Sequence, residues 1–201
     1  MGKKARTSRQ IQAAETKNRI YQAAIELLAS KGFENMTISE ISRRAEVSVG
    51  TFYLYFSSKT DILAEVFKQA DDFFLNEVAP LVKGKPAPQQ IVEYFSQYVA
   101  LNFSNGVKTT KHLFSPNVKF FIQNGRAMHT ILVDIVREGQ ARNEIRSDIP
   151  AEELERFLFV NAWGTIFEWN LYNGKIDLKD ATEKRVNLLV SALLPVQRPS
   201  E

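Results

Sequence analysis

Six side chains in the N-terminal third, five hydroxyls and one ammonium, are the groups best suited to binding chemistry. They are Thr37, Ser48, Thr51, Tyr53, Tyr55 and Lys59. Such groups donate hydrogen bonds to phosphates and base edges, so their clustering favours a nucleic-acid partner. The chain has no cysteine and no HExxH, GxSxG or phosphate-cradling glycine-rich motif, and His112 and His129 lack metal-ligand spacing. We therefore expect a binding protein with no catalytic residues, no metal and no cofactor.

Two short helices joined by a tight turn must position these side chains. Thr37 and Glu40 have the spacing of a capping box, which predicts that a short helix begins there. Ser48 is a good N-cap for a third helix that runs to about Tyr53. After a long first helix over 9–30, this order is typical of a helix-turn-helix, whose second short helix enters the major groove of DNA.

On that second short helix, Ser48, Val49 and Thr51 are the side chains placed to reach bases. The two hydroxyls can bond base edges or phosphates, whereas Val49 can touch a thymine methyl group but cannot read guanine. Gly50 has no Cβ, so DNA can approach the backbone closely there. A pure capping role for Ser48 and a plain surface position for Thr51 and Tyr53 stay open as alternatives.

Four further residues are predicted to hold the DNA backbone. Thr37 stands at a helix N-terminus, where N–H groups and a hydroxyl can meet a phosphate. Tyr53 and Tyr55 carry hydroxyls for phosphate contacts, and Lys59 adds a cation at the start of the fourth helix. With Val49 in the recognition helix, we expect thin base readout, prominent phosphate anchoring and some reading of DNA shape.

Residues 20–67 resemble the N-terminal domain of the TetR/AcrR family of transcriptional regulators. The resemblance begins with an A-x-x-L-x-x-x-x-G-F run that ends at Phe33. It continues at fixed spacing through Thr37, Ile41, Ala45, Val47, Ser48, Gly50, Thr51, Tyr53, Tyr55, Phe56, Ser58, Lys59 and Leu63. It implies a DNA-binding domain followed by a helical sensor domain, a dimer, and repression that a ligand relieves.

Three positions depart from the residues that are frequent in this family. Val49 stands where Lys or Arg is common, and Tyr55 stands where His is common. Glu46 occupies a turn position that Gly often fills. Because Gly adopts positive φ without steric cost, Glu46 must accept whatever strain the turn imposes.

Basic residues gather toward the N-terminus. Residues 1–70 contain 11 Lys and Arg against 7 Asp and Glu, and the first ten residues include four basic side chains and no acid. The asymmetry favours a polyanion partner, although solubility alone would also explain it. An arm that enters the minor groove and a solubilising tail stay open as interpretations of this stretch. No apolar run follows it, so we expect no signal peptide.

The whole sequence shows helical periodicity with little strand-like alternation, so we predict an all-α fold. About nine helices are expected, at 9–30, 37–45, 48–53, 58–80, 88–104, 107–114, 117–141, 151–172 and 179–194. We predict a three-helix DNA-binding domain over 1–65, with a basic arm at 1–9. A larger helical domain for ligand binding and dimerisation is predicted over 66–201.

Aromatic residues are dense after residue 90, with a few polar side chains interleaved. Ligand pockets are mostly apolar with a small number of placed polar groups, so this composition favours a small apolar or aromatic ligand. The predicted ligand-contacting residues are Phe95, Tyr98, Phe120, Phe121, Asn161 and Trp163. Ordinary core packing stays open for each of them, since a buried aromatic residue is more often core than pocket lining.

The helix predicted at 151–172 is apolar on several sides, so it must be covered from more than one direction. One stripe consists of Phe157, Val160, Gly164, Phe167 and Leu171. Leu188, Leu189, Ala192 and Leu193 of the last helix could extend that face. We expect a homodimer through the last two helices, which would set two recognition helices about 34–36 Å apart, the spacing of successive major grooves.

These features together predict a cytoplasmic regulator, without membrane contact, that binds a palindromic double-stranded DNA operator as a homodimer. Release by a small apolar or aromatic effector is expected, and repression rather than activation is implied only by the resemblance. A ligand-independent helix-turn-helix factor is the main alternative, and a helical enzyme is a weaker one. A tight dimer with no cavity would favour the ligand-independent factor.

Overall fold

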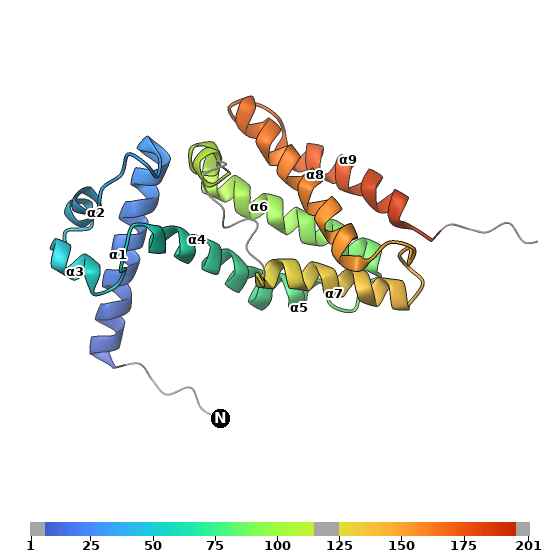
Figure 1. Cartoon of the computed structure of the whole chain (residues 1–201), viewed down its shortest axis with the longest axis horizontal. Helices are drawn as coiled ribbons and strands as arrows, with labels where there is room; N and C mark the ends of the chain where they lie inside the picture. Colours follow the sequence, from blue (N-terminus) through green and yellow to red (C-terminus); the bar gives the residue numbers. More distant parts are fainter. Residues whose placement is uncertain (1–6, 115–124, 196–201) are drawn as a thin grey trace, which may run out of the picture. The chain divides into compact units, whose positions relative to one another are not determined.

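The computed structural model describes residues 7–114 and 125–195, and all regular structure within these ranges is helical (Figure 1). The predicted all-α fold is therefore confirmed. The chain divides into two compact units, Met1–Phe67 and Lys68–Glu201. Among the described residues, no helix combines the length and the apolarity that crossing a membrane requires.

The first unit contains α1 (Ser8–Lys31), α2 (Ile38–Arg44), α3 (Val49–Tyr53) and the beginning of α4 (Thr60–Phe73). Its helices share one small apolar core. The buried residues of that core include Ile20, Ala24, Leu28, Ile41, Phe52, Phe56, Ile62 and Leu63. A five-residue helix is not stable alone, so α3 depends on this core for its conformation.

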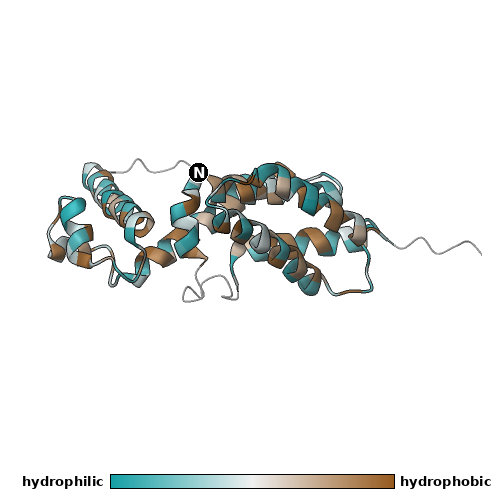
Figure 2. Ribbon diagram, turned by 90° about the horizontal axis from the view of Figure 1, so that it is seen from above, coloured by the Kyte–Doolittle hydropathy of each residue, from teal (hydrophilic) through white to brown (hydrophobic). Residues whose placement is uncertain are grey.

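The second unit continues from α4 with a π-helical segment, η1, and five further helices. They are η1 (Phe74–Val78), α5 (Ala79–Val82), α6 (Ala87–Leu113), α7 (Ala127–Ala141), α8 (Ala151–Leu171) and α9 (Leu178–Leu193). α6 packs against α7, α8 and α9, and α8 also packs against α7 and α9. Apolar and polar segments alternate along these helices in Figure 2, as expected for helices that bury one side.

One predicted helix is interrupted in the structure, and two predicted helices are joined. The single helix predicted over 58–80 is interrupted by η1. The sequence does not reveal this interruption, because an apolar pattern does not distinguish α-helical from π-helical hydrogen bonding. The helices predicted at 88–104 and 107–114 are the two parts of α6, separated by a kink at Gly106, whose φ and ψ are not helical. Gly106 has φ 76° and ψ 157°, a conformation that the missing Cβ permits, so the Asn105-Gly106 pair marks a kink rather than a loop.

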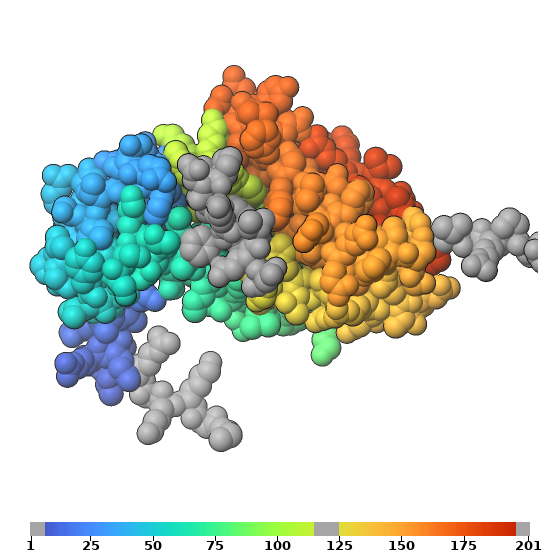
Figure 3. Space-filling view, in the orientation of Figure 1, coloured from blue at the N-terminus to red at the C-terminus, as the bar shows by residue number. Residues whose placement is uncertain are grey.

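One side of α8 is open in the single chain, and this side carries the predicted apolar stripe. Its exposed fractions are 47% for Phe157, 53% for Val160, 56% for Phe167 and 63% for Leu171. Figure 3 shows α8, in orange, on the face of the second unit that is turned toward the viewer. Leu188 of α9 is also exposed, but Leu193 is buried and belongs to the core of this unit.

Candidate DNA-binding and effector sites

The N-terminal end of α3 is organised by Ser48, the N-cap that the sequence predicts. Ser48 Oγ accepts a hydrogen bond from the Thr51 amide at 3.0 Å and lies 2.8 Å from Thr51 Oγ1, so the two hydroxyls are hydrogen-bonded to each other. Phe52, on the inner side of the helix, is fully buried. The cap and this anchor fix which side of α3 faces outward.

The outward side of α3 is exposed along its length. Ser48, Val49 and Gly50 are exposed, Tyr53 has 54% of its surface exposed, and Thr51 is half-buried. A Cβ built on Gly50 would meet only Ser48 Oγ, at 3.7 Å, so the surface there is flat and open. Within the first unit, these residues form a continuous surface that a DNA groove could cover.

The turn between α2 and α3 contains the strained residue that the sequence anticipates. Glu46 has φ 56°, in the left-handed region that favours glycine. This conformation ends α2 and allows the Val47 amide to donate to the Ser42 carbonyl at 2.9 Å. The strain at Glu46 therefore sets the angle at which α3 leaves the turn.

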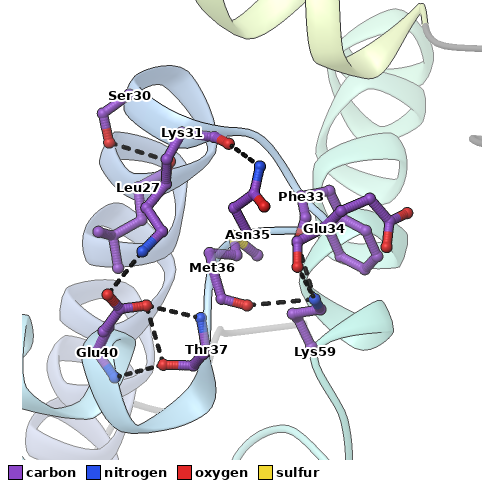
Figure 4. A network of polar contacts seen from close by, with 10 residues as sticks. All are labelled: Leu27, Ser30, Lys31, Phe33, Glu34, Asn35, Met36, Thr37, Glu40 and Lys59. Atoms are coloured by element: carbon purple, nitrogen blue, oxygen red, sulfur yellow. Dashed lines mark hydrogen bonds and ion pairs between the residues drawn. The ribbon is translucent and has the colours of Figure 1, made fainter.

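Thr37 and Glu40 form the predicted capping box, and Lys31 completes it (Figure 4). The Thr37 amide and hydroxyl donate to Glu40 Oε2 at 3.0 and 2.9 Å, and the Glu40 amide donates to Thr37 Oγ1 at 3.2 Å. Lys31 Nζ donates to Glu40 Oε1 at 2.6 Å. The hydrogen bond from Lys31, followed by those from Thr37, lowers the pKa of Glu40 to about 2. The Thr37 hydroxyl already has both a donor and an acceptor role inside the protein.

Lys59 points into the loop between α1 and α2 (Figure 4). Its Nζ donates to the carbonyl oxygens of Phe33 at 2.8 Å, Met36 at 3.2 Å and Glu34 at 3.4 Å. The ammonium also lies 4.5 Å from the ring centroid of Phe33. Through these contacts Lys59 stabilises the loop that leads to Thr37. Its contact with phosphate stays a prediction.

Tyr55 follows α3 and is half-buried, so its side chain has a part that DNA could reach. Next to it, Phe56 is buried and lies under the ammonium of Lys17, which is 5.4 Å from its ring centroid. Lys17 also pairs with Glu65 at 2.8 Å, which joins α1 to α4 within the first unit.

In the second unit, three of the predicted ligand-contacting residues gather around Phe159 of α8. The ring centroids of Phe95, Tyr98 and Trp163 lie 5.5, 5.6 and 6.0 Å from that of Phe159. Asn161 does not join this aromatic cluster, because it is partly exposed and donates to the Phe157 carbonyl within α8. Phe120 and Phe121 lie outside the described residues.

Tyr98 brings a polar group into the aromatic cluster. Burial raises the pKa of its hydroxyl well above the usual range, so the group stays protonated and remains a donor. Asn102 and Trp163 lie close to the hydroxyl, yet within the described part of the chain neither meets the geometry of a hydrogen bond. An unsatisfied buried hydroxyl costs about 1–3 kcal/mol, which a ligand acceptor could recover.

Arg126, which is buried, and Asp71, which is partly exposed, form a polar pair that the sequence does not reveal. The Arg126 guanidinium is 6% exposed and bonds the Asp71 carboxylate at 3.1 and 3.3 Å. Asp71 also accepts the Met128 amide at 3.2 Å, so it caps the start of α7 from α4. No local pattern predicts this pairing, because the partners are 55 residues apart.

A second polar pair lies beside the aromatic cluster. His129 Nδ1 is 2.5 Å from Glu155 Oε1, and the imidazole centroid lies 4.3 Å from that of Phe159. The contact fixes the histidine ring against Phe159. The pair thus brings hydrogen-bonding capacity next to an otherwise apolar cluster.

A surface groove of about 640 Å³ runs between α6 and the segment that leads into α9. Val99, Phe103 and Ile176 supply its apolar walls, and Lys175 and Lys179 also line it. None of the described residues predicted to contact ligand lines this groove. The groove and the aromatic cluster are therefore two separate candidate regions for small molecules.

Comparison with known proteins matches both units. Residues 20–66 match the family described as bacterial regulatory proteins, tetR family. The chain is 26% identical over 181 residues to the Fatty acid metabolism regulator protein of Bacillus subtilis (strain 168). The aligned region covers 87% of this chain and 93% of that protein.

Solved structures agree. The transcriptional regulator FadR from Bacillus subtilis, in complex with stearoyl-CoA, matches with a TM-score of 0.78 and 26% identity, over 88% of this chain and 98% of that one. Thermus thermophilus FadR, solved with lauroyl-CoA, has a TM-score of 0.67 at 23% identity, over 92% and 98% of the two chains.

The fold and the first unit thus define a helix-turn-helix DNA-binding regulator with a helical second unit. Residues 20–66 match the DNA-binding domain of the tetR family, and the whole chain is similar to transcriptional regulators.

Proposed function

We propose that this chain is a repressor that binds a palindromic operator as a homodimer and leaves it when an apolar effector binds. The first unit would serve as the DNA-binding domain and the second as the sensing and dimerisation domain. The exposed side of α3, held by a buried Phe52, is the observation that carries the proposal. As a DNA-binding regulator the protein is expected to act in the cytoplasm.

In this proposal the DNA contacts come from Ser48, Val49, Gly50, Thr51, Tyr53 and Tyr55. Their exposure on and after α3 supports the assignment. Thr37 and Lys59 would act mainly by stabilising the structure that positions α3, because their polar groups already bond the start of α2 and the loop before it. Loss of these two side chains should therefore change the placement of α3 as well as any direct phosphate contact.

We propose that the open side of α8 pairs with the same side of a second copy. An exposed apolar stripe of four large side chains on one helix is costly in water and marks an interaction surface. Gly164 is exposed in the middle of the stripe, and no atom lies within 4 Å of a Cβ built there, so two helices could approach closely. Leu188 and Ala192 of α9 would extend this face.

For the effector we propose a long-chain acyl thioester. Two related regulators carry stearoyl-CoA and lauroyl-CoA in their solved structures. Here, the aromatic cluster around Phe159 offers an apolar environment, and the Tyr98 hydroxyl offers a donor for a carbonyl oxygen. A ligand there would shift α4, which begins in the first unit and ends in the second, through a coupling of about 1–3 kcal/mol.

The test is operator binding followed by fluorescence anisotropy, on a duplex selected from a random library by the purified protein. Stearoyl-CoA should release the duplex, whereas free coenzyme A at the same concentration should not. The Tyr98→Phe variant should bind the duplex normally and need more stearoyl-CoA for release. If no acyl chain length changes the anisotropy, the effector assignment is wrong, and native mass spectrometry of the purified dimer would then decide whether any small molecule co-purifies.

A further inference from the structure

The outward side of α3 holds no side chain that can read a base pair through two hydrogen bonds. The stretch from Ser48 to Phe56 contains no Arg, Lys, Asn, Gln, Asp, Glu or His. Guanine is read by Arg or Lys and adenine by Asn or Gln, in each case with paired hydrogen bonds in the major groove. Readout of that kind is therefore not available to this segment.

The hydroxyls of the segment cannot replace it. Ser48 and Thr51 are hydrogen-bonded to each other, and Ser48 also accepts the Thr51 amide. Ser48 Oγ therefore has at most one further bond to offer, and Thr51 Oγ1 can add bonds only from a single atom. Since Ser and Thr pair with several bases, such a bond discriminates weakly among them.

Apolar side chains take the outward positions instead. In helical geometry, Gly50 and Leu54 are four residues apart on one side, opposite the buried Phe52 and Phe56. Leu54 has 80% of its surface exposed, and Val49, on the flank, has 41% exposed. Because Gly50 leaves the middle of this side flat, the base edges in the major groove can come near enough to contact both apolar side chains.

In the major groove, the thymine C5-methyl group is the apolar feature that identifies a base. We infer that Val49 and Leu54 read thymine methyl groups, and that these contacts carry most of the direct base readout by α3. The inference rests on the proposed DNA-binding function and specifies the kind of operator: T·A pairs, not G·C pairs, at the positions that α3 covers.

The experiment replaces single thymines of the selected operator by deoxyuridine, which removes one methyl group and leaves every hydrogen bond intact. Affinity of the unaltered protein is measured for each substituted duplex by anisotropy. At one or more positions per half-site, the affinity should fall by about fourfold, the value expected for one buried methyl group. Because the protein itself is unchanged, no folding defect can produce this result.

Variants then assign the methyl groups to side chains. Val49→Ala and Leu54→Ala should each abolish the deoxyuridine effect at one position and keep it at the other. Leu75→Ala, at a leucine of η1 in the second unit whose exposure lies between those of Val49 and Leu54, should leave every position as sensitive as before.

Uniform indifference to deoxyuridine, or a selected operator with conserved G·C pairs and no conserved thymine, would overturn the inference and leave the DNA-binding proposal standing. A protein that selects no duplex at all would overturn both.

Discussion

The Lys59 ammonium sits 2.8 Å from the Phe33 carbonyl oxygen and 4.5 Å from the centroid of the same residue's ring. One side chain at the start of α4 thereby closes the loop that precedes α2. This contact between residues 26 positions apart in the sequence thus stabilises the helix-turn-helix in addition to its apolar core.

Lys59→Met should destabilise the protein by about 1–3 kcal/mol, because it leaves partly buried carbonyls without their charged donor. Urea unfolding followed by circular dichroism measures this. Lys184→Met, which removes an exposed ion pair with Asp180, should shift the urea midpoint much less. An unchanged midpoint for Lys59→Met, together with weaker and less salt-dependent DNA binding, would show that Lys59 contacts phosphate instead.

Glu40 gives the first unit a predictable pH dependence. Its pKa is lowered from 4.5 to about 2 in the folded state, so its stabilising contribution is complete above about pH 5 and is lost as the pH falls toward 2. Glu40→Gln can keep the capping interaction but loses the ion pair with Lys31. The difference in Tm between the two proteins should be constant near neutral pH and disappear by about pH 2. A difference that persists at that pH would contradict this assignment.

Asp71→Ala should be among the most destabilising substitutions in the second unit. It removes the carboxylate bonded to the buried Arg126 guanidinium and uncaps α7, which together should cost about 2–4 kcal/mol. Glu152→Ala removes one of the carboxylates that pair with Arg137, in a contact that is more than half exposed, and should change stability much less. Equal costs for the two variants in urea unfolding would mean that burial gives the Asp71–Arg126 pair no special importance.

Phe167→Glu should convert the proposed dimer to a monomer, because it places a charge in the middle of the apolar side of α8. Sedimentation velocity reports the mass. Leu75→Glu changes a side chain of nearly equal exposure, 54% against 56%, on η1 and should leave the dimer intact. A dimer that survives Phe167→Glu would place the interface elsewhere.

Sequence patterns were reliable where a structure depends on neighbours three or four residues apart. The Thr37–Glu40 box and the Ser48 cap could be predicted because each bond closes within one helical turn. Glu46 could be singled out because its turn position is one that glycine often fills, and its φ is indeed positive.

Contacts between distant residues could not be predicted in this way. Lys59 was expected on DNA because its charge was visible in the sequence, while the carbonyls of the 33–36 loop that surround it were not. The Asp71–Arg126 pair and the separation of Asn161 from the aromatic cluster depend on how whole helices pack. The π-helical turn of η1 likewise leaves no signature in the apolar pattern.

The most direct test of the account is the affinity of the selected operator for Thr51→Ala and Tyr53→Phe, measured by anisotropy beside Tyr172→Phe. Tyr172, with 58% of its surface exposed, matches Tyr53 in type and exposure but lies at the end of α8. The account predicts that Tyr53→Phe loses about tenfold or more in affinity, the effect of one hydrogen bond to a charged phosphate, and that Thr51→Ala is also weakened. Tyr172→Phe should bind as the unaltered protein does. Unchanged affinity in both α3 variants would contradict the claim that this surface binds the operator.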